Sequence, residues 1–137
     1  MNLYEYIIKI ENTHRKRLNI ESEEKDLTAP LMTDYSRIGE IYNIYEDEIV
    51  KMKIKPHSIE GRRIFIFIIM RIFCPAVFTG KKLKRGIRDK IAEATGCEAS
   101  IISHDFSNLT FHYKKYKSFR TIVNTVYDSI IEILSEN

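Results

Sequence analysis

The chain has 137 residues, of which 44% are hydrophobic and 30% are charged, and its formal net charge is +3. This length suits one domain with a single core, the apolar content excludes a disordered chain, and the low counts of glycine (5) and proline (3) favour helices. The two cysteines, Cys74 and Cys97, form neither a zinc-binding spacing nor a secreted disulfide framework, so we expect reduced thiols.

The N-terminal residues predict an amphipathic helix over 3–17, followed by a linker. Four side chains at steps of three and four form one face of this helix: Leu3, Ile7, Ile10 and His14. Glu5 and Glu11 interrupt the apolar part and no small-residue cleavage site follows, so we expect no signal peptide and a cytoplasmic location. The acidic stretch at 21–34 contains Pro30 and predicts a loop or linker.

A second helix is predicted over residues 38–52, where apolar side chains again recur at helical spacing. They are Ile38, Ile41, Tyr42, Tyr45, Ile49 and Met52. Thr33 or Asp34 is available as its N-cap, and Pro56 is expected to end it. Three lysines near its C-terminus suit the helix dipole: Lys51, Lys53 and Lys55.

The stretch IEGRRIFIFIIMRIF at 59–73 predicts a helix that is apolar nearly all round and therefore lies at the centre of the core. Ser58 is expected to cap it and Pro75 to close it. A strand is the competing interpretation, because IFIFI has a strand-like composition. The apolar run at 64–70 is well short of the ~20 residues that a membrane span requires, so we expect no membrane partner.

Two further helices are predicted around a glycine. Leu83, Ile87 and Ile91 step by four, Ala92 and Ala94 join them, and Gly96 is expected to be the C-cap. The next helix is expected from Ala99 or Ser100 to about Phe111. Its buried side carries Ile102, Phe106 and Leu109.

The last helix is expected to begin at about Ser118 as a capping residue. Its apolar face comprises Phe119, Ile122, Val123, Val126, Tyr127, Ile130 and Leu134. About six helices and no convincing sheet predict an all-α, bundle-like domain. We expect residues 1–56 to form an N-terminal helical part for support or dimerisation, and residues 57–137 to form the core domain.

Positive charge is concentrated in the middle of the chain. Residues 57–120 carry 13 Lys and Arg against 5 Asp and Glu, a net +8, whereas residues 1–56 carry −2 and residues 121–137 carry −3. A polyanion should therefore bind the middle of the chain.

The stretch IAEATGCEASIISHDFSNL at 91–109 has the spacing of a helix-turn-helix. This motif needs a small residue where the helices cross, a glycine in the turn four residues later, and a branched aliphatic residue six residues after the glycine. Ala92, Gly96 and Ile102 occupy these positions, and with Glu98 and Ser103 the series resembles the helix-turn-helix of bacterial repressors. The resemblance covers about 20 residues and implies binding to double-stranded DNA.

The order of elements from Arg62 to Leu109 is also similar to the C-terminal DNA-binding domain of the chromosomal replication initiator. That family's reading helix opens with an Asp-His-Thr-Thr run, which CEASIISHD lacks. Its site recognition is therefore not carried over.

The helix-turn-helix interpretation assigns roles to two groups of polar residues. The base-reading residues would be Ser100, Ser103, His104, Ser107 and Asn108. The phosphate-binding residues would be Lys81, Lys82, Lys84, Arg85, Arg88, Lys114, Lys115 and Lys117. Asp105 would repel phosphate unless it accepts a hydrogen bond from a cytosine amino group or turns inward.

Two other interpretations stay open at this stage. A glycine between two amphipathic helices is also an ordinary C-cap, followed here by ordinary solvated residues. The chain would then be a protein-interaction module that binds through the tyrosine-rich stripe at 35–52, beside a basic surface that only confers solubility. Tyr113 and Tyr116 could stack on single-stranded bases, but their spacing favours the core.

No catalytic or ligand-binding pattern stands out. The sequence GKKLKRG at 80–86 lacks the order of a P-loop, and no metal-ligand spacing or nucleophile-base set is present. We therefore expect no enzymatic activity, no cofactor or metal, and no small-molecule ligand. The expected partner is double-stranded DNA, to which the chain could bind as a homodimer.

Overall fold

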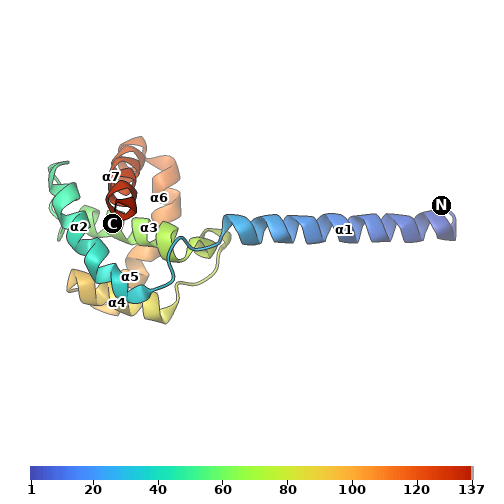
Figure 1. Cartoon of the computed structure of the whole chain (residues 1–137), viewed down its shortest axis with the longest axis horizontal. Helices are drawn as coiled ribbons and strands as arrows, with labels where there is room; N and C mark the ends of the chain where they lie inside the picture. Colours follow the sequence, from blue (N-terminus) through green and yellow to red (C-terminus); the bar gives the residue numbers. More distant parts are fainter. Residues whose placement is uncertain (137) are drawn as a thin grey trace.

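The structure is a computed structural model that describes residues 1–136, and within this range it is all-helical with no strand (Figure 1). The α-helices are α1 (Leu3–Leu27), α2 (Ile38–Val50), α3 (Ile59–Phe73), α4 (Arg85–Thr95), α5 (Ala99–Phe106), α6 (Leu109–Lys115) and α7 (Lys117–Ser135). Two short 3-10 helices, η1 (Tyr35–Arg37) and η2 (Pro75–Thr79), precede α2 and α4. The predicted all-α class is confirmed, with seven α-helices because the helix expected over 99–111 is two helices.

Helix α1 extends as a single rod away from the body of the protein (Figure 1). It is longer than predicted, because the acidic stretch after residue 20 continues the helix to Leu27 instead of forming a linker. This stretch is rich in Glu and Lys, which are good helix formers, and no proline intervenes before Pro30. The side chain of Asn2 caps the helix by accepting a hydrogen bond from the backbone N–H of Glu5, at 2.8 Å.

A side chain caps the start of α3 but not that of α2. The N-cap of α2 is Arg37, which makes no side-chain capping bond, so the prediction of Thr33 or Asp34 as the cap of this helix was wrong. Asp34 accepts a hydrogen bond from the backbone N–H of Ser36 and starts η1, which leads directly into α2. Ser58 accepts one from the backbone N–H of Gly61, at 3.0 Å, so the predicted cap and the helical interpretation of 59–73 are confirmed. Helix α2 ends at Val50, before Pro56, in a turn where Lys53 adopts a positive φ of 61°.

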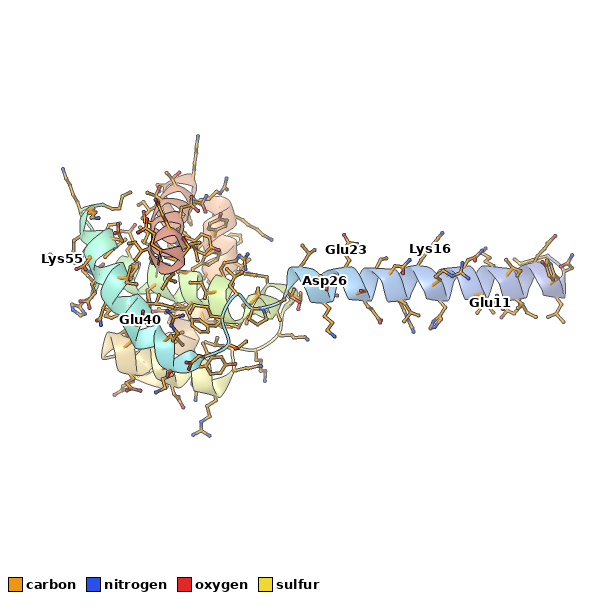
Figure 2. All side chains as sticks on the ribbon, viewed as in Figure 1. Glu11, Lys16, Glu23, Asp26, Glu40 and Lys55 are labelled. Atoms are coloured by element: carbon orange, nitrogen blue, oxygen red, sulfur yellow. The ribbon has the colours of Figure 1, made fainter. Side chains whose placement is uncertain are left out.

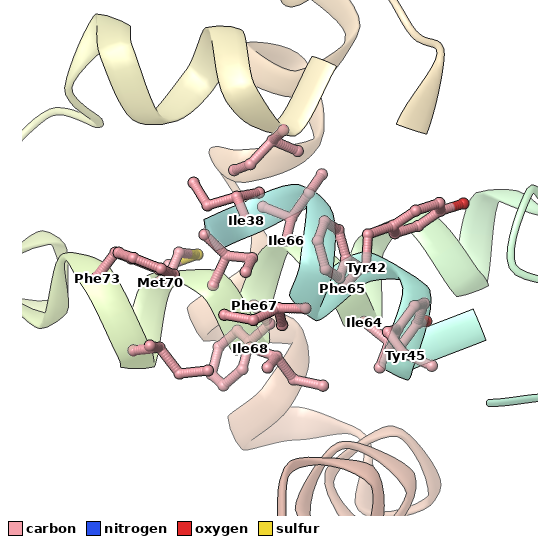
Figure 3. Close-up of a cluster of buried hydrophobic side chains, with 14 of the residues drawn as sticks. Ile38, Tyr42, Tyr45, Ile64, Phe65, Ile66, Phe67, Ile68, Met70 and Phe73 are labelled. Carbon is pink, nitrogen blue, oxygen red and sulfur yellow. The ribbon is translucent and has the colours of Figure 1, made fainter. Parts of the chain in front are cut away.

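Helix α3 occupies the centre of the core, as its composition predicted. Its buried residues are Gly61, Ile64, Phe65, Ile66, Phe67, Ile68, Ile69, Met70, Ile72 and Phe73 (Figure 3). Helices α2, α4, α5, α6 and α7 all pack against it. The rings of Tyr42 and Phe65 meet edge to face at 4.8 Å, and the Tyr45 hydroxyl donates a hydrogen bond to the carbonyl oxygen of Gly61. Burial raises the pKa of the Tyr45 hydroxyl far above its ordinary value.

The predicted boundary between residues 1–56 and 57–137 does not follow the packing. Helix α2 lies before that boundary, yet it shares one core with α3 through Ile41, Tyr45 and Ile49. Helix α1 contributes no residue to this core. The boundary between the N-terminal part and the packed body therefore lies between α1 and η1.

The C-terminal helix α7 covers the core beside α6. It begins at Lys117, so Ser118 lies inside its first turn, and the N-cap is Tyr116, which makes no side-chain capping bond. The prediction of Ser118 as the cap was therefore wrong. Its buried residues belong to the predicted apolar face: Phe119, Val123, Val126 and Ile130.

Every helix within residues 1–136 is too short or too polar to cross a lipid bilayer. The apolar run of α3 is buried by the protein itself.

Two glycines provide a matched test of this core. A methyl group on Gly61 would overlap the backbone carbonyl oxygen of Lys55 and lie 2.8 Å from that of Pro56, whereas one on the exposed Gly39 of α2 would meet nothing within 4 Å. We expect Gly61→Ala to lower the free energy of unfolding by about 1–3 kcal/mol and Gly39→Ala to raise it by about 0.5–1 kcal/mol. Urea unfolding followed by circular dichroism measures both, and a neutral Gly61→Ala would contradict this packing.

Candidate nucleic-acid interface

The turn between α4 and α5 is built around Gly96. Gly96 adopts a left-handed conformation, with φ 71° and ψ 19°, and the backbone N–H of Cys97 donates back to the carbonyl oxygen of Ala92 at 3.1 Å. Such a bond satisfies a free carbonyl at the helix end and reverses the chain. The predicted C-cap is confirmed, and α5 begins only three residues later, at Ala99.

Branched aliphatic side chains fix α5 against α4 and the body. Ile87 and Ile91 of α4 and Ile102 of α5 are completely buried, and Ala92 is half-buried beside them. The buried side predicted for α4 and the burial predicted for Ile102 are confirmed.

The polar residues predicted to face outward are all exposed: Ser100, Ser103, His104, Ser107 and Asn108. The predicted helix, however, ends at Phe106, because the backbone N–H and the hydroxyl of Ser107 both bond to the carbonyl oxygen of His104, at 3.4 and 2.8 Å. Ser107 and Asn108 therefore lie in the turn between α5 and α6, and only Ser100, Ser103 and His104 project from α5 itself.

Asp105 turns inward, which is one of the two ways considered for it to avoid repelling phosphate. Its carboxylate is 4% exposed and accepts a hydrogen bond from Nε of Arg62 on α3, while Nε of Arg63 lies 3.5 Å from its other oxygen. This hydrogen bond raises the pKa of the Arg62 guanidinium. Nη1 of Arg62 also lies 3.9 Å from Sγ of Cys97, so a single arginine contacts both the turn and α5.

The sequence analysis missed the two arginines, although the inward position of Asp105 could have been deduced. Residue 105 follows Ile102 by three and precedes Leu109 by four, and this spacing places it on the buried face. Arg62 and Arg63 lie about forty residues away, and nothing in the sequence links them to α5. Ile101 was also missed, and it is 38% exposed beside Ser100 on α5.

The basic residues before and within α4 are mostly accessible. Lys81, Lys82 and Lys84 are exposed in the segment that leads into α4, and the side chain of Arg85, its first residue, is 86% exposed. Arg88 is a poor phosphate ligand, because its side chain is only 32% exposed and its Nε is buried without an acceptor. Arg85 and Arg88 both lie within 4 Å of the carboxylate of Asp89.

The second group of predicted phosphate ligands lies at the end of α6 and the start of α7. Lys114, Lys115 and Lys117 are all exposed, on elements that pack mainly against α2, α3 and each other. The ammonium group of Lys115 lies 5.4 Å from the ring centre of Phe111 and 5.5 Å from that of Tyr116.

The two tyrosines beside these lysines have different environments. Tyr113 stacks on Phe67 with ring centres 4.7 Å apart, and its hydroxyl donates to Oδ1 of Asn124 at 2.7 Å. Tyr116 is 43% exposed. The core interpretation therefore holds for Tyr113 but was wrong for Tyr116.

The surface expected for a protein-interaction module is not accessible. Tyr42 and Tyr45 of the tyrosine-rich stripe at 35–52 are buried, and Tyr35 packs edge to face on Phe73 with ring centres 6.0 Å apart. The tyrosines of this stripe are therefore part of the core or packed against it.

The body also carries an apolar groove of about 420 Å³ between α3, η2, α6 and α7. Its apolar walls are Phe67, Ile68, Phe78, Tyr113, Val123 and Tyr127. Within residues 1–136 no three side chains of the metal-binding types gather at this groove or elsewhere.

Comparison with protein-family models, curated proteins and solved structures returns no match to this chain. The role of this interface therefore has to be argued from its own geometry and charge.

The ion pair beneath α5 provides a direct test of how that helix is held. We expect Asp105→Asn to lower the free energy of unfolding by about 3 kcal/mol, because it leaves two partly buried guanidinium groups without their carboxylate. Asp89→Asn is the matched control, since its side chain is 54% exposed and its loss should change stability by less than about 0.5 kcal/mol. Equal effects of the two substitutions in thermal unfolding would contradict the role given to Asp105.

Proposed function

We propose that the protein binds double-stranded DNA and places α5 in the major groove. The major groove accepts an α-helix, and recognition helices read base edges mainly with their N-terminal residues. In α5 these residues are Ser100, Ile101 and Ser103, with His104 one position further along. Serine and histidine can donate to and accept from base edges, and an exposed isoleucine suits the methyl group of thymine.

The observation that best supports this proposal is the burial of Asp105. Asp105 is the only carboxylate in α5, and Arg62 and Arg63 both neutralise it and hold it away from solvent. The exposed polar side chains of α5 are then Ser100, Ser103 and His104, none of which is acidic. The exposed side chains within α5 therefore add no negative charge that would repel a phosphate backbone.

The exposed cations next to this helix supply the general affinity for DNA. Lys81, Lys82, Lys84 and Arg85 lead into α4, which packs directly on α5. Lys114, Lys115 and Lys117 would add contacts further along the duplex, where Phe111 and Tyr116 are also exposed. Phosphate contacts of this kind position a protein on DNA, whereas the side chains in the groove select the sequence.

The biological role that fits best is a transcriptional regulator or an accessory factor in replication or in the movement of a mobile element. A pair of copies would present two reading helices to two half-sites, which is a common way to gain affinity.

The salt dependence of binding tests the phosphate contacts. We expect fluorescence anisotropy with the whole chain and a random duplex to show binding at low salt that weakens steeply as salt rises. Lys84→Ala/Arg85→Ala should weaken binding to any sequence and reduce the slope of log affinity against log salt by about 2, because two phosphate contacts are lost. No binding to duplex DNA at low salt would exclude the proposed function.

Lys53→Ala/Lys55→Ala is the matched control, because it removes the same charge from the turn between α2 and α3, where both lysines are exposed. If the slope of log affinity against log salt falls equally in both variants, DNA affinity depends on the net charge of the protein and not on the surface around α4 and α5.

A substitution at Glu98 is expected to strengthen DNA binding, whereas the lysine and arginine substitutions weaken it. It is exposed and is the N-cap residue of α5, so its carboxylate lies at the end of the helix that would read base edges. We expect Glu98→Gln to strengthen DNA binding about threefold to tenfold, since removing one repulsion near a phosphate is worth about 1 kcal/mol. Unchanged affinity in the same anisotropy assay would mean that the N-terminus of α5 does not face the duplex.

A further inference from the structure

Helix α1 makes no buried contact with the rest of its own chain. None of its 25 residues is buried, and it projects away from the body along its whole length (Figure 2). The chain just after it is anchored, because the backbone N–H groups of Leu31 and Met32 both donate to the carbonyl oxygen of Ile72, at 2.8 and 3.2 Å. The helix is therefore held at its C-terminal end and free over the remainder.

The side-chain interactions within α1 are few and exposed. They include the Asn2 cap, the pairs of Arg17 with Glu21 at 3.7 Å and with His14 at 3.4 Å, and Lys25 in the last turn. Each of these contributes little, and most of the stability of a helix in a protein comes from the packing of one of its faces. A helix of this kind needs a surface to pack against.

One side of α1 offers such a surface. Five apolar residues, which we call the α1 stripe, lie on one side of the helix: Leu3, Tyr6, Ile7, Ile10 and Leu18. Their steps of three, one, three and eight residues place them there. They are between 44% and 72% exposed. The opposite side is polar and carries Glu5, Asn12, Lys16, Asn19 and Glu23, and Lys16 and Glu23 project to the same side in Figure 2.

The apolar area is large enough for a stable contact. The α1 stripe offers on the order of 500 Å² of apolar surface per copy, or about 1,000 Å² for a pair. An area of about 1,000 Å² is the smallest that specific protein interfaces usually bury, and the flanking polar atoms would add to it.

The charges of α1 favour a second copy of the chain over a lipid surface. The helix carries 5 Lys and Arg against 6 Asp and Glu, so two copies do not repel each other strongly. Helices that lie on anionic membranes have a polar face rich in Lys and Arg, whereas the polar face here includes Glu5 and Glu23. Because each copy carries the same stripe, a pair related by twofold symmetry covers both stripes at once.

We propose that α1 is a self-association helix, and that two copies of the chain pack their α1 stripes against each other. This contact involves only α1 and its anchor, so it forms whether or not the protein binds DNA.

The mass of the whole chain in solution tests this proposal. We expect sedimentation equilibrium to give twice the chain mass, and Ile7→Glu/Ile10→Glu to raise the dissociation constant at least about 100-fold, because two buried isoleucines are lost. The helical signal in circular dichroism should fall in this variant as the unpaired α1 melts, while unfolding of the body stays unchanged.

Two further variants separate this contact from others. Asn12→Glu/Lys16→Glu alters the opposite face of α1 and should leave the dimer intact. Phe78→Glu alters the apolar groove of the body, and it should also leave the mass unchanged, since the contact joins α1 to α1. A whole chain that stays monomeric, a monomer that binds anionic phospholipid vesicles, or a dimer that Phe78→Glu dissociates would each overturn the proposal.

Discussion

The fold depends on burying one helix on every side. Helix α3 presents isoleucine, phenylalanine and methionine around its whole circumference from residue 64 to residue 70, so no arrangement that exposes one of its faces is stable. Helices α2, α4, α5, α6 and α7 together form the shell that covers it. The short helices and tight turns of the C-terminal half follow from this requirement, because several separate elements are needed to enclose a single rod.

The same central helix also fixes the candidate interface. Before its apolar run begins, α3 carries Arg62 and Arg63, and both reach Asp105 on α5. A buried carboxylate without partners would be strongly unfavourable, so this pair of arginines is what permits Asp105 to lie beneath α5. The consequence is a helix whose inner side is tied to the core by Ile102 and Asp105 and whose outer side carries serine, isoleucine and histidine. The orientation of the exposed face is thus set by residues that never contact a ligand.

Local patterns in the sequence predicted the elements that depend on local physics. The caps at Ser58 and Gly96 follow from side-chain and backbone chemistry within a few residues, and both were found where expected. The ends of helices were less predictable: Ser107 closes α5 with bonds of its own, and α1 continues through an acidic stretch that composition alone suggested was a linker. The link between Arg62 and Asp105 could not be predicted, because it joins residues that only the tertiary fold brings together.

The proposed interface and the free helix α1 are spatially separate features of one chain. Helix α1 leaves the body from the segment held at Ile72, whereas α5 lies against α4 and α3. Binding at one of them therefore leaves the other accessible. This arrangement suits a protein in which one element brings two bodies together and another contacts a shared ligand.

In the proposed complex, α5 and the basic segment before α4 contact the same DNA duplex. Chemical-shift mapping of the isotope-labelled whole chain during titration with a short duplex tests it most directly. We expect the backbone amide signals of residues 81–85, 99–108 and 114–117 to shift together, with the signals of α2 and of the remainder of α7 nearly unchanged. Shifts confined to α1 or to the groove between α3, α6 and α7, or no shift at low salt, would contradict it.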